Sequence, residues 1–393
     1  MIRFIDQMDL DGKRLLIRVD YNVPIKDGVI GDDNRIRASL PTLEYALNNG
    51  ASLILCSHLG KPKGQIKPEL SLAPVAVRLG ELLGRPVKMA PDCVGDEVRS
   101  MAKALAPGEV LMLENLRFHA EEQSGDEAFG RELAALCDVY CNDAFGTAHR
   151  AHASMTGIPA FAPARCAGFL LKKEWEFLGE ALAAPKRPYV AISGGSKVSS
   201  KLGILNNLLG KVDALIIGGA MANTFLLAQG HGVGASLVEP DLVEEARTVM
   251  KTAKERGVDL VLPLDFVIGE GPDAAKSAGV VDAEAGVPEG LMALDVGPKT
   301  VERYRQALSG AKTVVWNGPV GAFENPAFAE GSLELAKIIA GLDALTIGGG
   351  GDTGACLALA GLADAVTFIS TGGGSFMEFM EGKELPAFKA LEE

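Results

Sequence analysis

The chain has 393 residues, of which 48% are hydrophobic and 23% charged, and its formal net charge is −13 at pH 7. This composition is that of an ordinary globular protein, and the length exceeds what one hydrophobic core usually holds, so we expect two domains. The acidic balance argues against nucleic acid as a partner. No 18-residue apolar stretch or signal-peptide core is present, so we expect neither a membrane span nor export.

The acidic charge is uneven along the chain. Residues 1–168 carry 19 Lys and Arg against 22 Asp and Glu (net −3), whereas the remainder carries 19 against 29 (net −10). The first part is therefore the better host for a strongly anionic small molecule. The six cysteines are scattered, several of them within apolar runs, which predicts reduced core residues of a cytoplasmic protein. No zinc site is expected at Cys137 and Cys141, because no second Cys/His pair lies nearby.

Short apolar runs alternate with helical patterns such as Ser71–Leu83 and Glu244–Arg256. Strands that are apolar throughout and alternate with helices predict an α/β fold with parallel sheets covered by helices on both faces. The expected strands are Leu15–Val19, Leu53–Cys56, Val87–Met89, Val110–Leu113, Val139–Cys141, Tyr189–Ile192, Ala214–Ile217, Leu260–Leu262, Thr313–Trp316, Leu345–Ile347 and Val366–Ile369.

The strands fall into two blocks, which predict two Rossmann-like domains joined by a helical hinge. Residues 1–168 form the first domain, and residues 186–375 form the second. Between them, residues 169–185 form a helical pattern that ends in Ala-Ala-Pro and precedes Lys-Arg-Pro, a sequence typical of an interdomain connector. Residues 270–295 interrupt the rhythm with Gly, Pro and Val-Val pairs, and we expect a small excursion there.

The first domain is rich in cationic side chains that lie at or just after its apolar runs. Open α/β sheets bind ligands outside the carboxyl ends of their strands, so Asp20, Asn22, His58 and Arg117 are expected on a functional edge. The cationic set is Arg35, Arg37, His58, Lys61, Arg117, His149 and Arg150.

The second domain has three glycine clusters, each directly after an apolar run. They are Gly194–Lys197, Gly348–Thr353 and Thr371–Gly374. Glycine lets backbone N–H groups crowd around an anion, and a helix N-terminus adds its positive end. One such turn can be only a tight strand-to-helix connection. Three of them, with Lys197, Lys201 and Asp352 attached, indicate phosphate and Mg²⁺. Two different phosphorylated ligands are therefore predicted, one on each domain.

Other interpretations fit less well. Gly349–Gly354 satisfies the dinucleotide pattern G-x-G-x-x-G, but the next expected strand is followed by Ser370 and Thr371, with no acidic residue to hold a ribose. No P-loop motif and no nucleophile elbow occurs. His149 and His152 could form a metal pair, although an anion-facing or capping role suits them better. A hinged solute receptor would normally be exported, and no signal peptide is present.

Seven segments, in this order and spacing, resemble phosphoglycerate kinase along essentially the whole chain. They are Arg18–Pro24 (RVDYNVP), Ser57–Pro62 (SHLGKP), Leu113–Phe118 (LENLRF), Asn142–His152 (NDAFGTAHRAH), Gly194–Lys201 (GGSKVSSK), Val315–Gly321 (VWNGPVG) and Gly350–Thr353 (GGDT). The resemblance implies reversible transfer of the acyl phosphate of 1,3-bisphosphoglycerate to Mg-ADP, which gives 3-phosphoglycerate and ATP.

The resemblance also implies a site for each substrate. The nucleotide would bind the second domain, with Asp352 holding Mg²⁺ and Glu324 the ribose, and residues 376–393 would return to the first domain. The phosphoglycerate site implied by the motifs comprises Asp20, Tyr21, Asn22, Arg35, His58, Leu59, Gly60, Lys61, Arg117 and Arg150. The nucleotide site implied in the same way comprises Lys197, Lys201, Asn317, Glu324, Gly350, Gly351, Asp352 and Thr353.

One residue departs from the family pattern. The usual His-x-Gly-Arg-Pro is His58-Leu59-Gly60-Lys61-Pro62 here. Lysine keeps the positive charge of arginine but loses its planar fork, so we expect a weaker or point-like contact from Lys61.

The expected chemistry needs alignment and charge neutralisation rather than a general base, because both groups that exchange phosphate are already ionised. We expect Arg35 and Lys197 to be the most catalytic side chains, with help from the N–H groups of Gly372 to Gly374 if that turn opens a helix. An ion pair with Asp32 or Asp33 is the alternative role for Arg35. Ligands held on separate domains would have to be brought together by hinge closure, and we expect a monomer.

Overall fold

The computed structural model describes residues 1–392, without the side chains of residues 180 and 181. The chain divides into two compact units. The first unit comprises Met1–Gly179 and the chain from Glu384 onward, and the second comprises Glu180–Lys383. Within the described residues, every helix is too short or too polar to cross a membrane.

The first unit is built on a six-stranded parallel sheet with the order β5-β6-β4-β1-β7-β8. A two-stranded antiparallel hairpin, β2-β3, stands apart from it. The strands are β1 (Arg14–Val19), β2 (Ile25–Lys26), β3 (Val29–Ile30), β4 (Ser52–Cys56), β5 (Val87–Met89), β6 (Val110–Met112), β7 (Val139–Asp143) and β8 (Arg165–Ala167). β8 and the hairpin are short segments that the apolar pattern did not predict.

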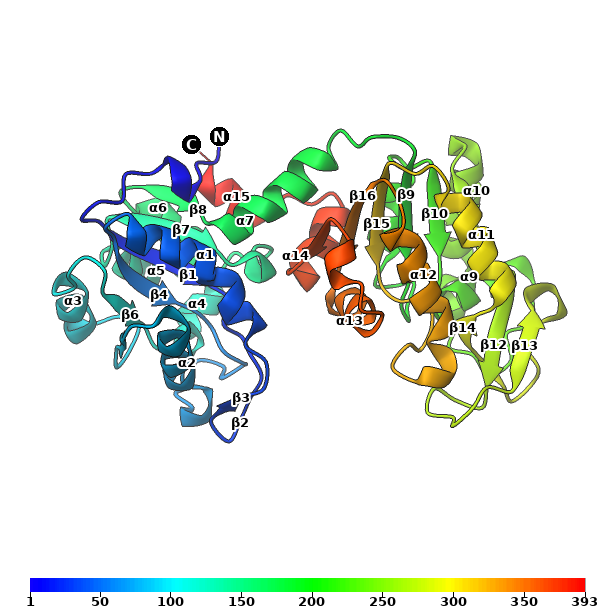
Figure 1. Ribbon diagram of the computed structural model, residues 1–393, viewed down its shortest axis with the longest axis horizontal. Helices are drawn as coiled ribbons and strands as arrows, with labels where there is room; N and C mark the ends of the chain where they lie inside the picture. Colours follow the sequence, from blue (N-terminus) through cyan, green and yellow to red (C-terminus); the bar gives the residue numbers. More distant parts are fainter. Residues whose placement is uncertain (393) are drawn as a thin grey trace. The chain divides into compact units, whose positions relative to one another are not determined.

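Helices cover both faces of this sheet (Figure 1). They are α1 (Asn34–Asn48), α2 (Ala73–Leu83), α3 (Asp96–Lys103), α4 (Ala120–Ser124), α5 (Glu127–Ala134), α6 (Ile158–Phe161), α7 (Phe169–Glu174) and α15 (Pro386–Leu391). Short 3₁₀ or π turns lie at η1 (Ile5–Gln7), η2 (Pro68–Leu70), η3 (Leu116–Phe118), η4 (Phe145–Thr147), η5 (Ala153–Gly157) and η6 (Trp175–Ala181).

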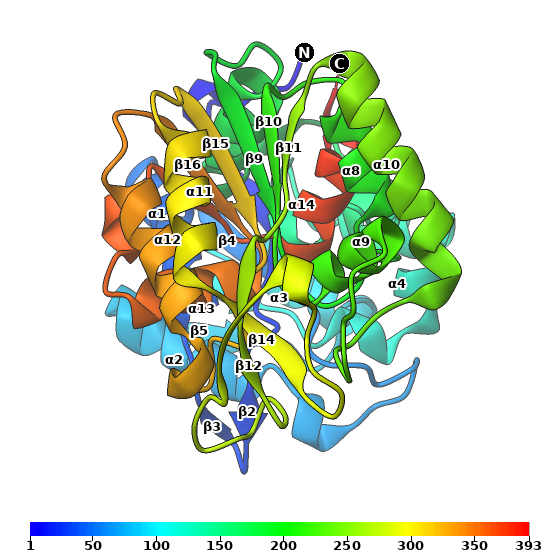
Figure 2. The same cartoon turned by 90° about the vertical axis from the view of Figure 1, so that its right-hand side faces the viewer.

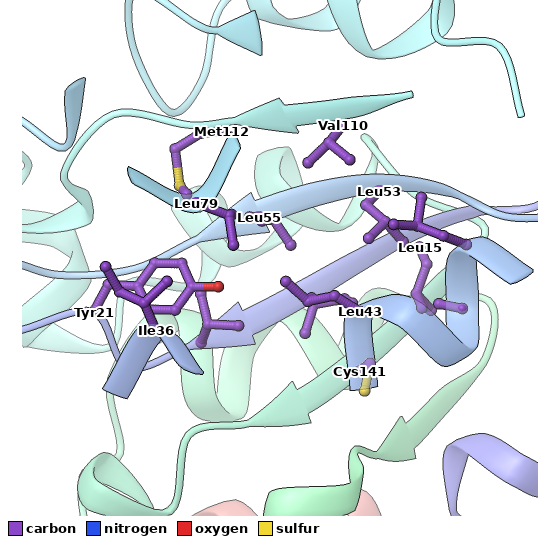
Figure 3. Packing of buried hydrophobic residues seen from close by; sticks show 14 of the residues in the cluster. Leu15, Tyr21, Ile36, Leu43, Leu53, Leu55, Leu79, Val110, Met112 and Cys141 are labelled. Atoms are coloured by element: carbon purple, nitrogen blue, oxygen red, sulfur yellow. The ribbon is translucent and has the colours of Figure 1, made fainter. Parts of the chain in front are cut away.

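One core of the first unit forms where α1 and α2 pack on the sheet. Leu15 of β1, Leu53 of β4, Leu43 of α1 and Leu79 of α2 are fully buried in it, with Tyr21 at one end (Figure 3). Each aliphatic side chain buried in this way contributes about 1.5–3 kcal/mol relative to exposure. Alternate strand residues point to the opposite face, where Leu16, Arg18 and Ile54 are also fully buried, so helices must cover both faces.

The second unit repeats the architecture with a parallel sheet in the order β11-β10-β9-β15-β16-β17. Its strands are β9 (Tyr189–Ser193), β10 (Ala214–Ile217), β11 (Asp259–Val261), β15 (Thr313–Asn317), β16 (Leu345–Gly349) and β17 (Phe368–Ser370). Its helices are α8 (Leu202–Leu208), α9 (Met221–Gln229), α10 (Val243–Arg256), α11 (Pro298–Leu308), α12 (Glu330–Ala340), α13 (Gly351–Leu359) and α14 (Gly373–Met380), with 3₁₀ turns η7 (Pro240–Leu242), η8 (Ala283–Ala285), η9 (Pro326–Phe328) and η10 (Ala363–Ala365). The predicted class, parallel sheets flanked by helices, is confirmed.

The excursion expected at residues 270–295 lies within a small sheet of its own. The antiparallel strands β12 (Asp265–Gly269), β13 (Gly279–Asp282) and β14 (Met292–Val296) have the order β13-β12-β14. In Figure 2, β12 and β14 lie below the main sheet of the second unit. They enclose a satellite core around Phe266 and Ile268.

The segment that returns to the first unit is shorter than the predicted 376–393. Residues up to Lys383 belong to the second unit, because α14 packs on α8 and β16. Phe376 is fully buried there, and a Cβ added to Gly349 would come within 2.1 Å of its ring. In the first unit, Phe388 of α15 packs on Trp175 with ring centroids 5.0 Å apart. Residue 393, the last of the predicted segment, lies outside the described residues.

The predicted connector helix, residues 169–185, is α7 followed by the π-helical turn η6. The carboxylate of Asp143, at the end of β7, accepts hydrogen bonds from the backbone N–H groups of Leu170 (2.9 Å) and Leu171 (3.2 Å). It thereby satisfies donors that the first turn of a helix leaves unpaired. Burial raises the pKa of Asp143 to about 6, against the opposing effect of these hydrogen bonds.

Candidate ligand sites of the two units

The carboxyl ends of β1, β4, β6 and β7 lie at one edge of the first sheet, because the four strands are parallel. The motif residues of the first unit follow these strands, as expected from their sequence positions. Asp20 and Asn22 follow β1, His58 and Gly60 follow β4, and Arg117 lies in η3 after β6. The fold therefore gathers residues that are up to about a hundred positions apart in the chain.

Asp20 and Arg35 form an ion pair across this edge. Arg35 Nη1 lies 2.6 Å from Asp20 Oδ2, and the Arg35 side chain stays 45% exposed. The alternative partners are engaged elsewhere, since Asp32 accepts from the backbone of Asn34 and Asp33 pairs with Arg37 and Arg78. Arg35 is thus held among the motif residues and keeps guanidinium donors toward solvent.

Gly60 lies in the loop after β4 and connects it to the loops after β1 and β6. Its backbone N–H donates to Asn22 Oδ1 (2.9 Å), and its carbonyl accepts from Arg117 Nη1 (2.8 Å). Its φ of +61° is a left-handed conformation that favours glycine. Lys61 follows directly and is exposed. The start of the Lys61 side chain is therefore fixed by an anchored backbone.

Tyr21 and Leu59, which the motifs place in the site, have core side chains. Tyr21 is fully buried, and its hydroxyl lies 2.7 Å from Ser39 Oγ. Leu59 is buried too, and both its backbone polar groups pair with the side chain of Asn115. These two residues fix the loops after β1 and β4. Arg150, by contrast, is exposed after η4.

His58 is buried beside several cations. Its Nδ1 lies 3.1 Å from Arg18 Nη2 and 4.0 Å from Asp20 Oδ1. Burial first, and then the charges of Arg18, Arg117 and Arg35, hold the pKa of His58 well below its usual range, so the ring is neutral at pH 7. Arg18 belongs to a motif quoted above, but the sequence offered no reason to single it out.

Asp92, Cys93 and His119 form a further cluster with ligand atoms within 4.8 Å of one another. Its groups are already paired. His119 Nε2 lies 2.6 Å from Asp92 Oδ1, and the Cys93 thiol donates to the carbonyl of Glu114 (3.0 Å). The His119 ring also stacks on Phe129, with centroids 5.1 Å apart. Asp92 and His119 are therefore bonded to each other, and His119 directly follows η3.

In the second unit, the loops after β9, β10 and β15 approach one another backbone to backbone. A Cβ added to Gly194 would lie 2.2 Å from the Pro319 carbonyl oxygen, and one on Gly219 would lie 2.6 Å from the Gly195 oxygen. Hydrogen bonds close the junction, including Gly195 N to Pro319 O (3.0 Å) and Gly219 N to Val320 O (3.1 Å). Only glycine fits at the Gly194 contact, and Gly195 has space around it but a φ of +112° that favours glycine, which together explain the first glycine cluster.

Lys201 and Asn317 meet beside this junction. Lys201 Nζ donates to Asn317 Oδ1, and Asn317 Nδ2 donates to the Gly349 carbonyl (2.7 Å). Burial lowers the pKa of Lys201 to about 8, while nearby Asp352 opposes the shift. The sequence placed Lys201 in the site, but its burial depends on packing across strands and could not be predicted.

A cavity of about 360 Å³ opens at the same edge of the second sheet. Glu324 and Asp352 line it together with Gly195 and Ser196 of the first glycine cluster. Its apolar wall includes four residues outside the sequence motifs, namely Leu237, Phe266, Met292 and Leu294. Those residues come from the β12–β14 sheet and the loop after α9, and they carry no local signal of a ligand.

The two other glycine clusters open helices. Gly350, with φ +91°, precedes α13, and Asp352 lies exposed in its first turn. Thr353 is buried and accepts a hydrogen bond from Gly318 N (2.8 Å). Gly372 precedes α14, which begins at Gly373. This turn therefore opens a helix, as an amide contribution from Gly372 to Gly374 requires.

Lys197 is exposed in the loop after β9.

Comparison with known proteins identifies the family. The sequence profile of phosphoglycerate kinase matches residues 5–383. A phosphoglycerate kinase of Maridesulfovibrio salexigens is 59% identical over the full length of both chains. Solved phosphoglycerate kinase structures from Coxiella burnetii (TM-score 0.92, 42% identity, covering 100% of this chain and 99% of that one) and Pyrococcus horikoshii (0.84, 33%, 100% and 98%) share the fold. The chain therefore belongs to the phosphoglycerate kinase family, phosphotransferases with a carboxyl group as acceptor that bind phosphoglycerate and ADP or ATP and act in glycolysis.

Proposed function

We propose that the first unit binds the phosphoglycerate through side chains and that the second binds the magnesium complex of the nucleotide, largely through backbone. The observation that carries the proposal is the contrast between the two sheet edges. Arg35, Arg117 and His58 gather at one, and glycine junctions with helix N-termini gather at the other.

In the first unit, Asp20, Asn22 and Gly60 act as the frame for the cationic residues. Arg35 donates one hydrogen bond to Asp20, and Arg117 donates one to Gly60. Both keep further guanidinium donors for the carboxylate and phosphate of the substrate. Arg150 and Lys61 are exposed and add charge at longer reach. His58, which is neutral, donates a hydrogen bond without adding charge.

In the second unit, the apolar wall of the cavity suits an adenine base, and Glu324 suits the ribose hydroxyls. Lys201, Asn317 and the start of α13 suit the phosphates, which helix N-termini attract.

Asp352 is an exposed carboxylate that lines the cavity, and such oxygen ligands suit Mg²⁺ that is also bound to phosphates. The ion, when bound, neutralises phosphate charge.

The reaction needs no proton transfer. An oxygen of the ADP β-phosphate forms the new P–O bond while the bond from phosphorus to the carboxylate oxygen of 1,3-bisphosphoglycerate breaks, and the carboxylate leaves as an anion. Arg35 and Lys197 stabilise the charge on the phosphoryl group in transfer, and the N–H groups of Gly372 and Gly373 at the start of α14 assist. The reacting atoms must come within about 3–3.5 Å, so hinge closure brings the two ligands together.

We further infer a cytoplasmic monomer without a nucleic-acid partner. The six cysteines are free and buried, which suits a reducing compartment. Sedimentation of the purified chain checks the monomer, because a dimer would double the measured mass.

The assignment of ligands to units is tested by steady-state kinetics in both directions. Arg117→Gln is expected to raise KM for 3-phosphoglycerate by at least about tenfold and to leave the nucleotide KM unchanged, since it removes a charge-assisted contact. Lys201→Gln is expected to do the opposite. A crossed result, with each variant affecting the other substrate, contradicts the assignment. ATP formation from ADP and 1,3-bisphosphoglycerate, with NADH as a non-binding control, checks the activity itself.

A further inference from the structure

Arg18 is a charged side chain buried completely within the first unit. It lies on β1, on the face of the sheet opposite to Leu15 and Ile17, and its exposed fraction is 0%. Its Nε donates to Ser154 Oγ (2.9 Å), its Nη1 to the carbonyl of Val19, and its Nη2 to His58 Nδ1 (3.1 Å). A guanidinium stays charged in a protein, and a buried charge is costly unless it is matched.

The matching charge is Glu122, on α4, which is also fully buried. It accepts from Ser154 N (2.8 Å) and from Ser154 Oγ (2.6 Å). A serine hydroxyl has one hydrogen, so Ser154 accepts from Arg18 and donates to Glu122. The direction of the chain Arg18 to Ser154 to Glu122 is therefore fixed by the chemistry of its ends.

The same reasoning fixes the tautomer of His58. Arginine has donors and no acceptor, so the His58 Nδ1 that faces Arg18 must be the unprotonated ring nitrogen. A neutral ring then carries its proton on Nε2. Neighbouring groups do not reverse this assignment. Asp20 Oδ1 is 4.0 Å from Nδ1, beyond hydrogen-bond distance, and Arg117 and Arg35 are further cations that oppose a second proton.

We infer that Glu122, Ser154 and Arg18 are positioning residues that hold His58 as its Nε2–H tautomer, a neutral hydrogen-bond donor for an anionic substrate. The inference rests on the proposed function, in which His58 faces the phosphoglycerate. Glu122 holds the Arg18 side chain in place through Ser154, and Arg18 in turn fixes the orientation of the His58 ring. Three further titratable groups lie beside the chain, namely His152, with Nδ1 3.7 Å from Glu122 Oε1, and the buried side chains of Cys56 and Tyr140.

Ring ¹H–¹⁵N NMR spectra of the full chain labelled at its five histidines test the tautomer without any substrate. His58 is assigned by the signal that disappears in His58→Gln. In the wild-type protein we expect a protonated Nε2 and an unprotonated Nδ1 that do not titrate between pH 6 and 9. A proton on Nδ1, or an imidazolium at pH 7, overturns the inference.

Variants then test the chain of contacts. Ser154→Ala removes the bridging hydroxyl and keeps the backbone bond to Glu122. We expect a mixture of His58 tautomers. KM for 3-phosphoglycerate should rise about threefold to tenfold, which corresponds to the loss of one hydrogen bond, and the nucleotide KM should stay unchanged. Ser154→Thr, which keeps the hydroxyl, should restore both readings. Glu122→Gln should give a larger effect if it folds.

Tyr140→Phe is the matched control. It deletes another buried hydroxyl, which donates to the backbone carbonyl of Ser154 (2.8 Å) and takes no part in the side-chain contacts between Arg18, Ser154 and Glu122. It should lower stability to a similar degree and leave the tautomer and both KM values unchanged. If Ser154→Ala behaves like Tyr140→Phe, the three residues are only structural. A wild-type protein with the expected tautomer that fails to bind 3-phosphoglycerate at the first unit would instead contradict the proposed function.

Discussion

The two units share the same sheet architecture, but side-chain contacts hold the loops of the first candidate site and backbone contacts hold those of the second. At the edge of the first sheet, side chains hold the loops, as Arg35 holds Asp20 and Arg117 holds Gly60. At the edge of the second sheet, main chain meets main chain, as Gly194 meets Pro319. The loops of the first site are held mainly by charged and polar side chains, whereas those of the second are held mainly by close backbone contacts that only glycine permits.

This difference predicts opposite sensitivities to substitution. A lost cation in the first unit removes a contact but leaves the backbone frame, since Gly60 and Asn22 are still paired. An added methyl group in the second unit moves the backbone, and with it every amide of the junction. Lys61→Ala in the first unit and Gly194→Ala in the second test this contrast directly.

The largest effect is expected at the carboxylate that we assign to the metal. Asp352→Asn keeps the shape of the side chain but removes its charge, so turnover should fall at least about a hundredfold. Binding of 3-phosphoglycerate, measured by calorimetry, should stay near normal. A rate that depends on Mg²⁺ concentration as in the wild-type protein would remove Asp352 from the role. Asp364→Asn, at an exposed acid of η10, is the control.

Next comes the glycine junction. Gly194→Ala would place a Cβ 2.2 Å from the Pro319 carbonyl oxygen and 2.4 Å from that of Gly318, both of which are backbone atoms. Relief requires backbone movement, so the second unit should lose about 1–3 kcal/mol of stability and the nucleotide affinity should fall about tenfold or more. Gly271→Ala, where nothing lies within 4 Å, should change neither. Thermal unfolding and nucleotide titration measure both quantities, and equal behaviour of the two variants would refute the steric account.

A smaller effect concerns pH and Lys201. Its pKa in the folded chain is about 8, below the usual 10.5, because burial disfavours the charged form. Between pH 8 and 10.5 the unfolded chain binds the extra proton, so this lysine makes stability rise with pH in that window. Nucleotide affinity should move the other way and fall by up to about tenfold per pH unit above 8, as the cation is lost. Lys201→Met should weaken binding at pH 7 and flatten both profiles. A wild-type affinity that is constant from pH 7 to 9.5 contradicts the assignment.

The sequence predicted most of what depends on local pattern. The apolar runs gave the strands of both parallel sheets apart from the three-residue β8, and the motifs placed Asp20, His58 and Arg117 on one edge. The predicted start of the returning segment, residue 376, lies eight residues before the observed start at Glu384. The apolar character of Phe376 is compatible with burial in either unit, and only its packing against Gly349 assigns it to the second.

What the sequence could not predict are partnerships between distant residues. Glu122 and Ser154 lie 32 positions apart, and neither shows from its neighbours that it is buried. The apolar wall of the nucleotide cavity is similar, since Phe266 and Leu294 read as ordinary core residues. Sequence patterns report periodicity and motif, whereas the matching of buried charges and the lining of a cavity arise only when the elements pack.

The smallest effect is expected at the departure from the family pattern. Lys61 follows Gly60, whose N–H and carbonyl are both bonded, so its side chain starts from a fixed point and is exposed. A lysine there acts as a point charge, and Lys61→Arg could add a second parallel hydrogen bond to a substrate phosphate, worth on the order of 1 kcal/mol or about fivefold in affinity. Lys61→Ala should weaken 3-phosphoglycerate binding and leave ADP binding unchanged. Lys26→Ala, at an exposed lysine of the β2-β3 hairpin, should affect neither. Calorimetric titration with 3-phosphoglycerate decides the matter. If both substitutions at position 61 leave the affinity unchanged, Lys61 is only a solvated turn residue, and the side-chain site of the first unit ends at Gly60 and Arg117.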